Sequence, residues 1–302
     1  MYFRSIKKSI ALFFVMVAVA GGVFAASNRE RGAGKEPVRI GSKNFTENLI
    51  LAEIYALALE AEGIPVKRNF GLASSVVHTA IVNNEIDLYP EYTGTGLLAV
   101  LQHDLVTDPQ EVYRIVKTEY EKRFNLVWLD YAQANDGQGL VVTAEISRQY
   151  GIRTISDLQA NAARIRFASQ GEFDEREDGI PGLTAVYGPF GFQSSRVYDN
   201  ALKYEVLLRG EADAAPAYTT EGQLATPAFV LLEDDKHVWP PYNIAPVVRK
   251  KTLEQYPLAA TILNRVNKTI DTPTITALNA RVDVDKREYT EVAREFFNSI
   301  VK

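Results

Sequence analysis

The sequence predicts an α/β protein of two similar lobes, each built on a mostly parallel sheet flanked by helices. Short apolar segments alternate with helical segments of ten or more residues, a pattern typical of parallel sheets rather than of sandwiches or barrels. The chain has 302 residues, of which 46% are hydrophobic and 24% charged, so it is long enough for two globular domains. One strand and loop recur about 126 residues apart, which indicates that the two domains resemble each other.

The repeated stretch is the end of a strand that runs into a Tyr-Thr loop. At an offset of 126 residues, five of nine positions are identical: Glu85 and Glu211, Asp87 and Asp213, Pro90 and Pro216, Tyr92 and Tyr218, and Thr93 and Thr219. Upstream, residues 39–43 resemble residues 166–170 at an offset of 127. Two copies are too few for a solenoid, which needs at least three. We therefore interpret them as paired domains whose Tyr-Thr loops face each other across a cleft.

The N-terminus has the pattern of a secretory signal peptide. Basic residues (Arg4, Lys7 and Lys8) precede an apolar run, and small residues near position 25 indicate cleavage after Ala25. A retained membrane anchor is the alternative, because Ile10 to Ala26 is uncharged and just long enough to span a bilayer. We expect residues 1–25 to be a signal peptide, residues 26–37 a flexible leader, and the protein to be located in the periplasm.

Composition excludes several classes of function. The formal net charge is −5, and it becomes more negative once the basic signal peptide is removed, which argues against a nucleic-acid partner. The chain has no cysteine, so disulfides, thiolate metal sites, a thiol nucleophile and a lipid-modified cysteine are all excluded. We expect the mature protein to be an untethered monomer.

Hydrophobic periodicity and turn signals place the elements of the first lobe. Gly63 ends the first helix, and the sequence Asp108-Pro109-Gln110-Glu111 predicts the start of another. The expected elements are strands at 38–41, 65–70, 86–89 and 126–129, and helices at 46–62, 74–83 and 108–123.

Asn135-Asp136-Gly137 is a turn signal, and we interpret it as the crossing into the second lobe. Lobe I is therefore expected to comprise residues 38–137 and 243–302, and lobe II residues 138–242. The remaining strands are expected at 139–143, 166–168, 230–232 and 244–249, and the remaining helices after a Ser156 cap and at 200–210, 253–269, 273–284 and 288–301. Ligands of such sheets bind beyond the carboxyl ends of the strands, where both Tyr-Thr loops are expected.

Catalytic and cofactor motifs are missing from the sequence. There is no P-loop, dinucleotide fingerprint or nucleophile elbow, and the three histidines (His78, His103 and His237) lack metal-ligand spacing. We therefore predict no catalytic residues, no metal site and no cofactor, and favour a binding protein over an enzyme. Two alternatives stay open: an extracytoplasmic enzyme for a small cationic substrate, with Asp136 or Glu91 as base, and a sensor lobe of a receptor.

Aromatic residues gather near predicted strand ends and crossings: Tyr89, Tyr92, Phe173, Tyr218 and Tyr242. A quaternary ammonium has no N–H to donate, so proteins recognise it through ring faces, carboxylates and shape. Each ring contributes about 0.5–2 kcal/mol, so three rings supply roughly 2–6 kcal/mol of the about 8 kcal/mol that a micromolar complex requires.

From Val38 to Lys302 the chain resembles the substrate-binding proteins of osmoprotectant ABC importers, which bind glycine betaine, choline, carnitine or proline betaine. Five blocks carry the resemblance: residues 41–47, 87–95, 172–181 and 216–220, and residues 232–236 with Pro240-Pro241-Tyr242. The resemblance implies a two-lobed periplasmic binding protein fold of the type II kind, with the ligand in the interlobe cleft. It also implies hinge closure on the solute and a membrane permease as partner.

The resemblance places an aromatic box, or cage, on three tyrosines and assigns the ligand's carboxylate to a second group of residues. The implied ligand-binding residues are Tyr92, Tyr218 and Tyr242, with Phe173 beside them; Lys43, Thr95 and Arg176 for the carboxylate; and Asp136 and Gln138 at the crossing. Charge-assisted hydrogen bonds from Lys43 and Arg176 suit a betaine carboxylate.

Gln138 departs from the family's pattern, because members often carry another tyrosine at this position. An amide offers hydrogen bonds but no ring face. The departure implies weaker binding of glycine betaine, or a ligand with more polar groups, such as a polar amino acid or another zwitterion. Tyr131 and Tyr89 are candidates for the missing ring.

Overall fold

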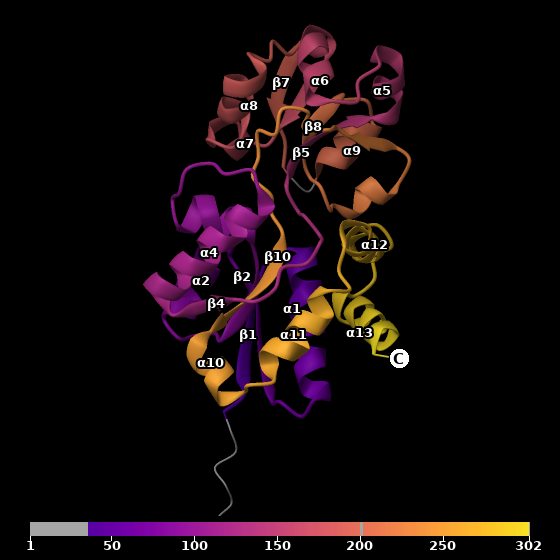
Figure 1. Cartoon of the computed structure of the whole chain (residues 1–302). Helices are drawn as coiled ribbons and strands as arrows, with labels where there is room; N and C mark the ends of the chain where they lie inside the picture. Colours follow the sequence, from indigo (N-terminus) through magenta and orange to yellow (C-terminus); the bar gives the residue numbers. More distant parts are fainter. Residues whose placement is uncertain (1–35, 200–201, 302) are drawn as a thin grey trace, which may run out of the picture. The chain divides into compact units, whose positions relative to one another are not determined.

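The computed structural model describes residues 36–199 and 202–301 (Figure 1). The predicted signal peptide and all but the last two residues of the predicted leader lie outside the described residues. Within the described part, no helix combines the length and the apolar character that crossing a bilayer demands.

Two mixed sheets of five strands form the framework of the described chain. The first has the order β2-β1-β3-β10-β4 and the second β7-β6-β8-β5-β9. The strands of the first sheet are β1 (Val38–Lys43), β2 (Val66–Leu72), β3 (Leu88–Tyr92), β4 (Leu126–Trp128) and β10 (Ile244–Arg249). Those of the second are β5 (Gln138–Thr143), β6 (Arg166–Ser169), β7 (Ser194–Val197), β8 (Ala214–Tyr218) and β9 (Phe229–Leu231).

One strand in each sheet runs against the others. It is β10 in the first sheet, antiparallel to β3 and β4, and β5 in the second, antiparallel to β8 and β9. These are the strands by which the chain enters each sheet from the other one. The predicted mostly parallel sheets are therefore confirmed. The lobe bounds 38–137 with 243–302, and 138–242, stay our proposal; strands on opposite sides of each bound belong to different sheets.

Helices flank both sheets. Those associated with the first are α1 (Thr46–Ala61), α2 (Ser74–Val82), α3 (Thr93–Thr95), the π-helical turn η1 (Gly96–Val100), α4 (Pro109–Phe124), α10 (Lys250–Gln255), α11 (Ala259–Asn267), α12 (Thr272–Asp283) and α13 (Tyr289–Ile300). Those in the segment of the second are α5 (Ala144–Tyr150), α6 (Ile155–Asn161), η2 (Ala162–Arg164), α7 (Glu172–Glu175), α8 (Ile180–Tyr187), α9 (Lys203–Leu208) and η4 (Gly222–Ala225).

Alternation along the strands decides which side chains face which helices. Leu88 and Tyr92 on β3 belong to the same core as α1 and α11, whereas Tyr89 points to the opposite face, against α4. Figure 1 shows α2 and α4 on one side of this sheet and α1 and α11 on the other. Helix α1 packs against α11, α12 and α13 as well as the sheet, which explains why its sequence is apolar on most faces.

Two predicted helix features are wrong. The expected single helix at 253–269 is two helices, α10 and α11, because Tyr256 precedes Pro257 and adopts a non-helical conformation (φ −128°, ψ 76°). The cap of α6 is Thr154 and not Ser156: the Thr154 hydroxyl accepts from the backbone of Asp157, whose carboxylate accepts from the backbone of Thr154 in return.

The sequence repeat corresponds to a repeated clasp between strands. The Arg39 guanidinium donates to Asp87 through Nε and Nη2, both at 2.8 Å. The Arg166 guanidinium donates to Asp213 through the same two atoms, at 2.9 and 2.6 Å. Each arginine also donates from Nη1 to a backbone carbonyl, of Asn84 or Gly210. Both clasps therefore tie the first strand of a copy to the start of its Tyr-Thr strand.

The repeated threonines form hydrogen bonds to the two crossings, the segments around residues 135–137 and 241–243 where the chain passes between the sheets. Thr93 Oγ1 donates to the carbonyl of Pro241 and accepts from the N–H of Asn243, both at 2.9 Å. Thr219 Oγ1 donates to the carbonyl of Asn135 at 2.7 Å and accepts from the N–H of Gly137 at 2.9 Å. Asn135 and Asn243 also form an antiparallel bridge, so the two crossings lie side by side.

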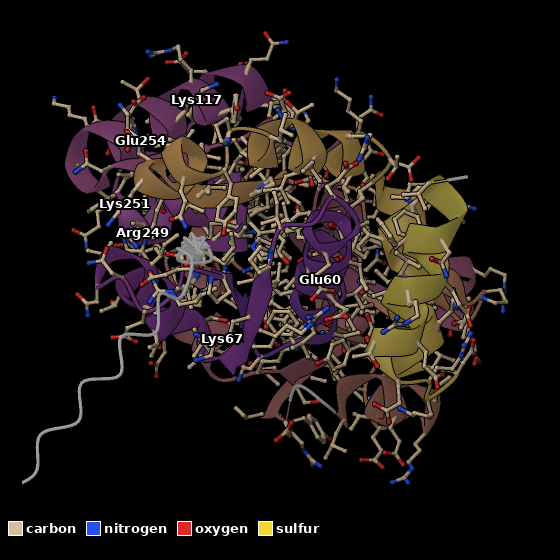
Figure 2. The ribbon with its side chains drawn as sticks, turned by 90° about the horizontal axis from the view of Figure 1, so that it is seen from below. Glu60, Lys67, Lys117, Arg249, Lys251 and Glu254 are labelled. Atoms are coloured by element: carbon tan, nitrogen blue, oxygen red, sulfur yellow. The ribbon has the colours of Figure 1, made fainter. Side chains whose placement is uncertain are left out.

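Charges of both signs are mixed at the end of the first sheet where its parallel strands begin. Figure 2 labels Glu60, Lys67, Lys117, Arg249, Lys251 and Glu254 on this side. Several neighbouring charges pair, as in Arg68 with Glu60 at 2.6 Å and Lys250 with Glu121 at 2.9 Å. Interspersed acids and bases of this kind are typical of a solvated surface.

Candidate ligand-binding site

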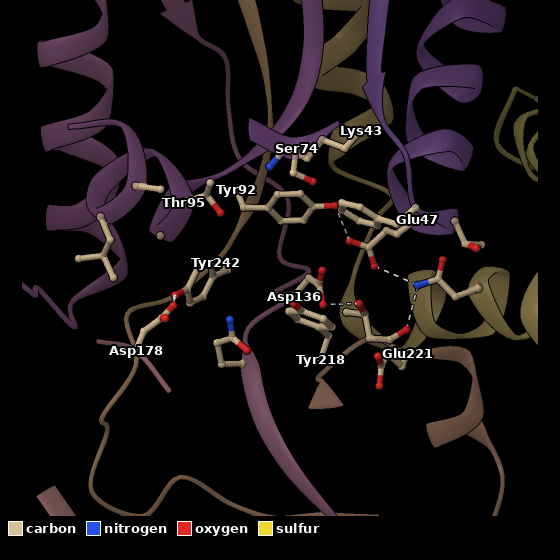
Figure 3. Close-up of a pocket in the computed structure, with 18 of the residues that line it drawn as sticks. Lys43, Glu47, Ser74, Tyr92, Thr95, Asp136, Asp178, Tyr218, Glu221 and Tyr242 are labelled. Carbon is tan, nitrogen blue, oxygen red and sulfur yellow. Dashed lines mark hydrogen bonds between the residues drawn. The ribbon is translucent and has the colours of Figure 1, made fainter. Parts of the chain in front are cut away.

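A cavity of about 560 Å³ lies at the carboxyl ends of β3 and β8 (Figure 3). Its wall is formed by the starts of α1 and α2, the loop after β3, the first crossing, the turn between α7 and α8, the loop after β8, the second crossing and part of α12. The two Tyr-Thr loops therefore meet at one hollow, as the repeat predicted.

The three tyrosines expected to form the box all line this cavity. Tyr92 ends β3, Tyr218 ends β8, and Tyr242 stands on the second crossing; Figure 3 shows the three around one hollow. Two glycines hold the Tyr242 ring between them. A methyl group on Gly94 would lie 2.7 Å from the ring, and one on Gly137 would lie 3.6 Å from its other edge.

Two carboxyl groups, those of Glu47 and Asp136, occupy the same wall. Tyr92 donates its hydroxyl to Glu47 Oε1 at 2.9 Å, and Thr220 donates its hydroxyl to Asp136 Oδ1 at 2.6 Å. Glu47 is 3% exposed, whereas Asp136 keeps part of its surface open to the cavity. Burial raises the pKa of Glu47 and holds that of Asp136 well above its usual range, and the neighbouring charge of Glu47 adds to the second effect.

Both cations predicted to bind a ligand carboxylate line the cavity but already have acidic partners. Lys43 Nζ lies 2.5 Å from Glu91 Oε1 and 4.8 Å from the centre of the Tyr92 ring. Arg176 donates to both oxygens of Asp178, at 2.7 and 2.5 Å. The Tyr242 hydroxyl also donates to Asp178, at 3.4 Å, so this carboxylate links a box ring to Arg176.

The structure places the remaining predicted residues in different positions. Thr95 and Gln138 line the cavity, but Phe173 does not. Phe173 is buried at 5% exposure and lines an adjoining hollow of about 350 Å³, whose wall also includes Gln138, Arg176 and Tyr218. Those three residues therefore stand between the two hollows.

Neither candidate for the missing ring lines the cavity. Tyr89 is fully buried on the opposite face of β3 and donates to Glu91 Oε2 at 3.1 Å. Tyr131 packs edge-on against Tyr113, with ring centres 4.9 Å apart. Position 138 therefore contributes an amide, and the fourth aromatic side chain of the wall is Phe45, whose ring centre lies 6.0 Å from that of Tyr92.

Sequence reasoning missed several polar residues of the wall: Glu47, Asp178, Glu221 and Asn279. A signal existed for Glu47, because it is an acid in the first turn of a helix that directly follows a strand and loop. Asn279 gave none, since it lies on a C-terminal helix far along the chain. The described residues contain no group of histidines, cysteines and acids that would hold a metal ion.

Two sheets of equal strand order, with a ring-lined cavity at the carboxyl ends of the repeated strands, define a solute-binding protein of the two-lobed α/β type. The family described as the substrate-binding domain of ABC-type glycine betaine transport systems matches residues 36–299. The chain belongs to this family, which confirms the resemblance and the fold. Substrate-binding proteins of ABC importers are not an enzyme class and act outside the cytoplasm.

Individual relatives agree with the family. The chain is 34% identical to a glycine-betaine-binding protein of Pseudomonas aeruginosa over 91% of this chain and 90% of that protein. It is 32% identical to the ergothioneine transport permease/ergothioneine binding protein EgtU of Helicobacter pylori, over 98% of this chain but 53% of that protein, so it spans about half of that relative's length. A crystal structure of a glycine betaine/carnitine/choline ABC transporter superposes with a TM-score of 0.80 at 27% identity, covering 87% of this chain and 98% of that one.

Proposed function

We propose that this protein is the solute-binding component of an ABC importer and that it binds a quaternary-ammonium solute of the betaine or choline type. One observation carries the proposal: a tyrosine from each half of the repeat and a third from the second crossing, together with the acid pair Glu47 and Asp136, line a single cavity. Rings and carboxylates are the groups that recognise a trimethylammonium head, and each ring adds about 0.5–2 kcal/mol. Closure of the lobes on the solute supplies the remaining affinity.

Of the two cations predicted to bind the carboxylate of a betaine, only one is accessible. Arg176 is 45% exposed in its side chain, so a ligand carboxylate can share its guanidinium with Asp178. Lys43 is 4% exposed and held by Glu91, which favours a supporting role beneath Tyr92. Thr95 and Gln138 supply neutral hydrogen-bonding groups to the same ligand.

The setting of this activity is part of the proposal. The signal peptide at residues 1–25 exports the protein to the periplasm, where the mature monomer closes on its solute and delivers it unchanged to a membrane permease. The relatives named for glycine betaine and the shared family support this setting.

Calorimetric titration with glycine betaine, choline, carnitine and ergothioneine tests the proposal. Tyr218→Ala should weaken binding of the best ligand by roughly tenfold, as expected for the loss of one desolvated ring. Tyr289→Ala on α13, away from the cavity wall, is the matched control and should leave the affinity unchanged. Ligand recovered by chromatography after long incubation should be intact. No binding of any of the four solutes, or a chemically altered ligand, would contradict the proposal.

A betaine with a polar ring is the second candidate, and Gln138 favours it. This amide lines both the main cavity and the adjoining hollow, so a ligand held by its ammonium in the box can extend toward it. Ergothioneine, named for the Helicobacter pylori relative, joins a trimethylammonium carboxylate to a sulfur-bearing imidazole ring that can hydrogen-bond to an amide. Gln138→Ala should then weaken ergothioneine binding several-fold more than glycine betaine binding. Equal effects on both ligands would favour the simple betaine.

A further inference from the structure

Glu47 and Asp136 form an acid pair on the cavity wall. Each described side chain that donates a hydrogen bond to these two carboxyl groups is uncharged. Tyr92 and Asn279 donate to the two oxygens of Glu47, at 2.9 and 3.0 Å, and Thr220 donates to Asp136 at 2.6 Å. Within the described residues, no lysine or arginine forms an ion pair with either carboxyl group. The positive charge that acts on Asp136 is that of Lys203, and it is already ion-paired with Glu221.

Glu47 and Asp136 lie on one wall, linked through Asn279 and Thr220. Two neighbouring carboxyl groups keep one proton between them, because ionising both places like charges together in a poorly solvated site. Burial raises the pKa of both groups, and the charge of Glu47 raises that of Asp136 further. The pair consequently stays singly protonated at a pH where an ordinary aspartic acid is ionised.

The charged and titratable groups around the pair do not remove this proton. Tyr55 lies on the helix of Glu47, Tyr92 on β3 and Tyr218 on β8, and each is an acid weaker than a carboxylic acid. Glu221 adds a further negative charge near Asp136, but it is ion-paired with Lys203 at 2.5 Å. Asp283, on the same cavity wall, accepts from the Thr46 hydroxyl at 2.6 Å.

Asn279 provides a second, independent observation that points to a ligand at this wall, because one of its polar atoms has no partner. Its Nδ2 atom donates to Glu47 and, at 2.8 Å, to the backbone carbonyl of Thr220, so its Oδ1 atom points elsewhere. Asn279 is 3% exposed and lines the cavity. Its Oδ1 atom is buried and has no hydrogen-bond partner within the described chain. This wall thus presents an unpaired acceptor next to the Glu47 carboxyl group, which suits a positively charged group.

We propose that the cationic head of the ligand takes the place of the proton shared by Glu47 and Asp136, so that each binding event releases one proton to the solvent. The proposal rests on the proposed quaternary-ammonium ligand. A trimethylammonium group has no N–H and cannot replace the proton as a donor, so it acts by charge alone and leaves both carboxyl groups ionised. The singly protonated pair plus the cation gives the doubly ionised pair with the bound cation plus one H⁺, which the buffer takes up.

The released proton can be counted directly. Wild-type protein is titrated calorimetrically with choline chloride, and separately with glycine betaine, in two buffers of different ionisation enthalpy at one pH. The buffer dependence of the heat should correspond to about one proton released per ligand. The association constant should rise up to about tenfold per pH unit while the pair is protonated and level off above that range.

Three variants identify the source of the proton. Asp136→Asn and Glu47→Gln each leave a single carboxyl group with no shared proton, so the proton count should fall to near zero and the pH dependence should flatten. Asp104→Asn changes an exposed carboxylate that does not line the cavity and should keep the count near one.

The outcomes separate the two proposals. Saturable choline binding with no buffer dependence in the wild type would overturn the proton exchange and leave the proposed function standing. Proton release that persists in both Asp136→Asn and Glu47→Gln would also overturn it, because the proton would come from elsewhere. If the wild type binds no quaternary-ammonium solute, both proposals are wrong. If a variant does not fold, the proton count of the wild-type protein still tests the proposed proton release.

Discussion

Lys43 and Glu91 form an ion pair in which the ammonium lies 2.5 Å from a carboxylate oxygen and the side chains are only 4% and 1% exposed. Glu91 also accepts from the Tyr89 hydroxyl and from the backbone N–H of Tyr92. The lysine therefore holds together the turn that presents Tyr92 to the cavity. Its place on the cavity wall therefore does not by itself make Lys43 a ligand contact.

Lys43→Met should destabilise the protein more than it affects ligand recognition. The substitution leaves the buried Glu91 carboxylate without its cation, which costs about 3–5 kcal/mol. Urea unfolding should show this loss, and the double variant Lys43→Met/Glu91→Gln should recover much of it. If Lys43→Met instead keeps its stability and loses ligand affinity, the lysine contacts the ligand directly.

Gly94→Ala should weaken ligand binding, because its methyl group would lie 2.7 Å from the Tyr242 ring and force that ring to move. We expect a loss of about 1 kcal/mol, roughly fivefold in Kd, measured by calorimetry. Gly137→Ala is the matched control, since its methyl group would meet the other edge of the ring at 3.6 Å, an ordinary contact. Equal affinities of the two variants would argue against a role for the Tyr242 ring.

Thr93→Val and Thr219→Val should each loosen a crossing. Valine keeps the shape of threonine but removes the hydroxyl that bridges a backbone N–H and a carbonyl, at a cost of about 1–3 kcal/mol. Thermal unfolding measures the loss, and Thr→Ser at the same positions should retain most of the stability. A serine variant as unstable as the valine variant would assign the effect to the lost methyl group instead.

Asp87 should contribute stability that is lost in acid. Burial acts to raise its pKa, but the hydrogen bonds and charge of Arg39 and a hydrogen bond from Arg249 together outweigh burial, so the net pKa lies below the ordinary value. A depressed carboxylate pKa stabilises the folded state above the unfolded pKa, near 4, and this contribution disappears as the pH falls below it. Asp87→Asn should therefore lower stability at neutral pH and flatten the loss of stability as the pH falls below about 4. An exposed control, Asp104→Asn, should behave as the wild type.

Much of the architecture was predictable because it depends on local signals. Turn residues and apolar runs located β3 and β8, and the repeat of Tyr92 at Tyr218 indicated that both rings face one cleft. Pro257 was a readable break in a helix, and overlooking it led to the wrong prediction of a single helix there. The Arg39 and Arg166 clasps explain why the aspartates of the repeat match: each closes the same hydrogen-bonded pair.

The partners of the site residues were not predictable, because they come from distant parts of the chain. Asn279 donates to Glu47, 232 positions earlier in the sequence, and the hydrophobic periodicity of the two helices does not predict that contact. Lys43 and Arg176 looked free to bind a carboxylate in sequence, yet each meets an acid in three dimensions. The face on which Tyr89 lies followed from strand alternation and could have excluded it from the box.

The neighbouring crossings have a consequence for how the chain acquires its structure. Residues 138–242 leave and re-enter at adjacent points, near the Asn135 and Asn243 bridge, so this segment can collapse without waiting for later residues. The other half must wait, because β10 arrives more than a hundred residues after its neighbours β3 and β4. When the chain emerges N-terminus first, we expect residues 138–242 to form their structure first, and the first sheet to be completed only when β10 has emerged.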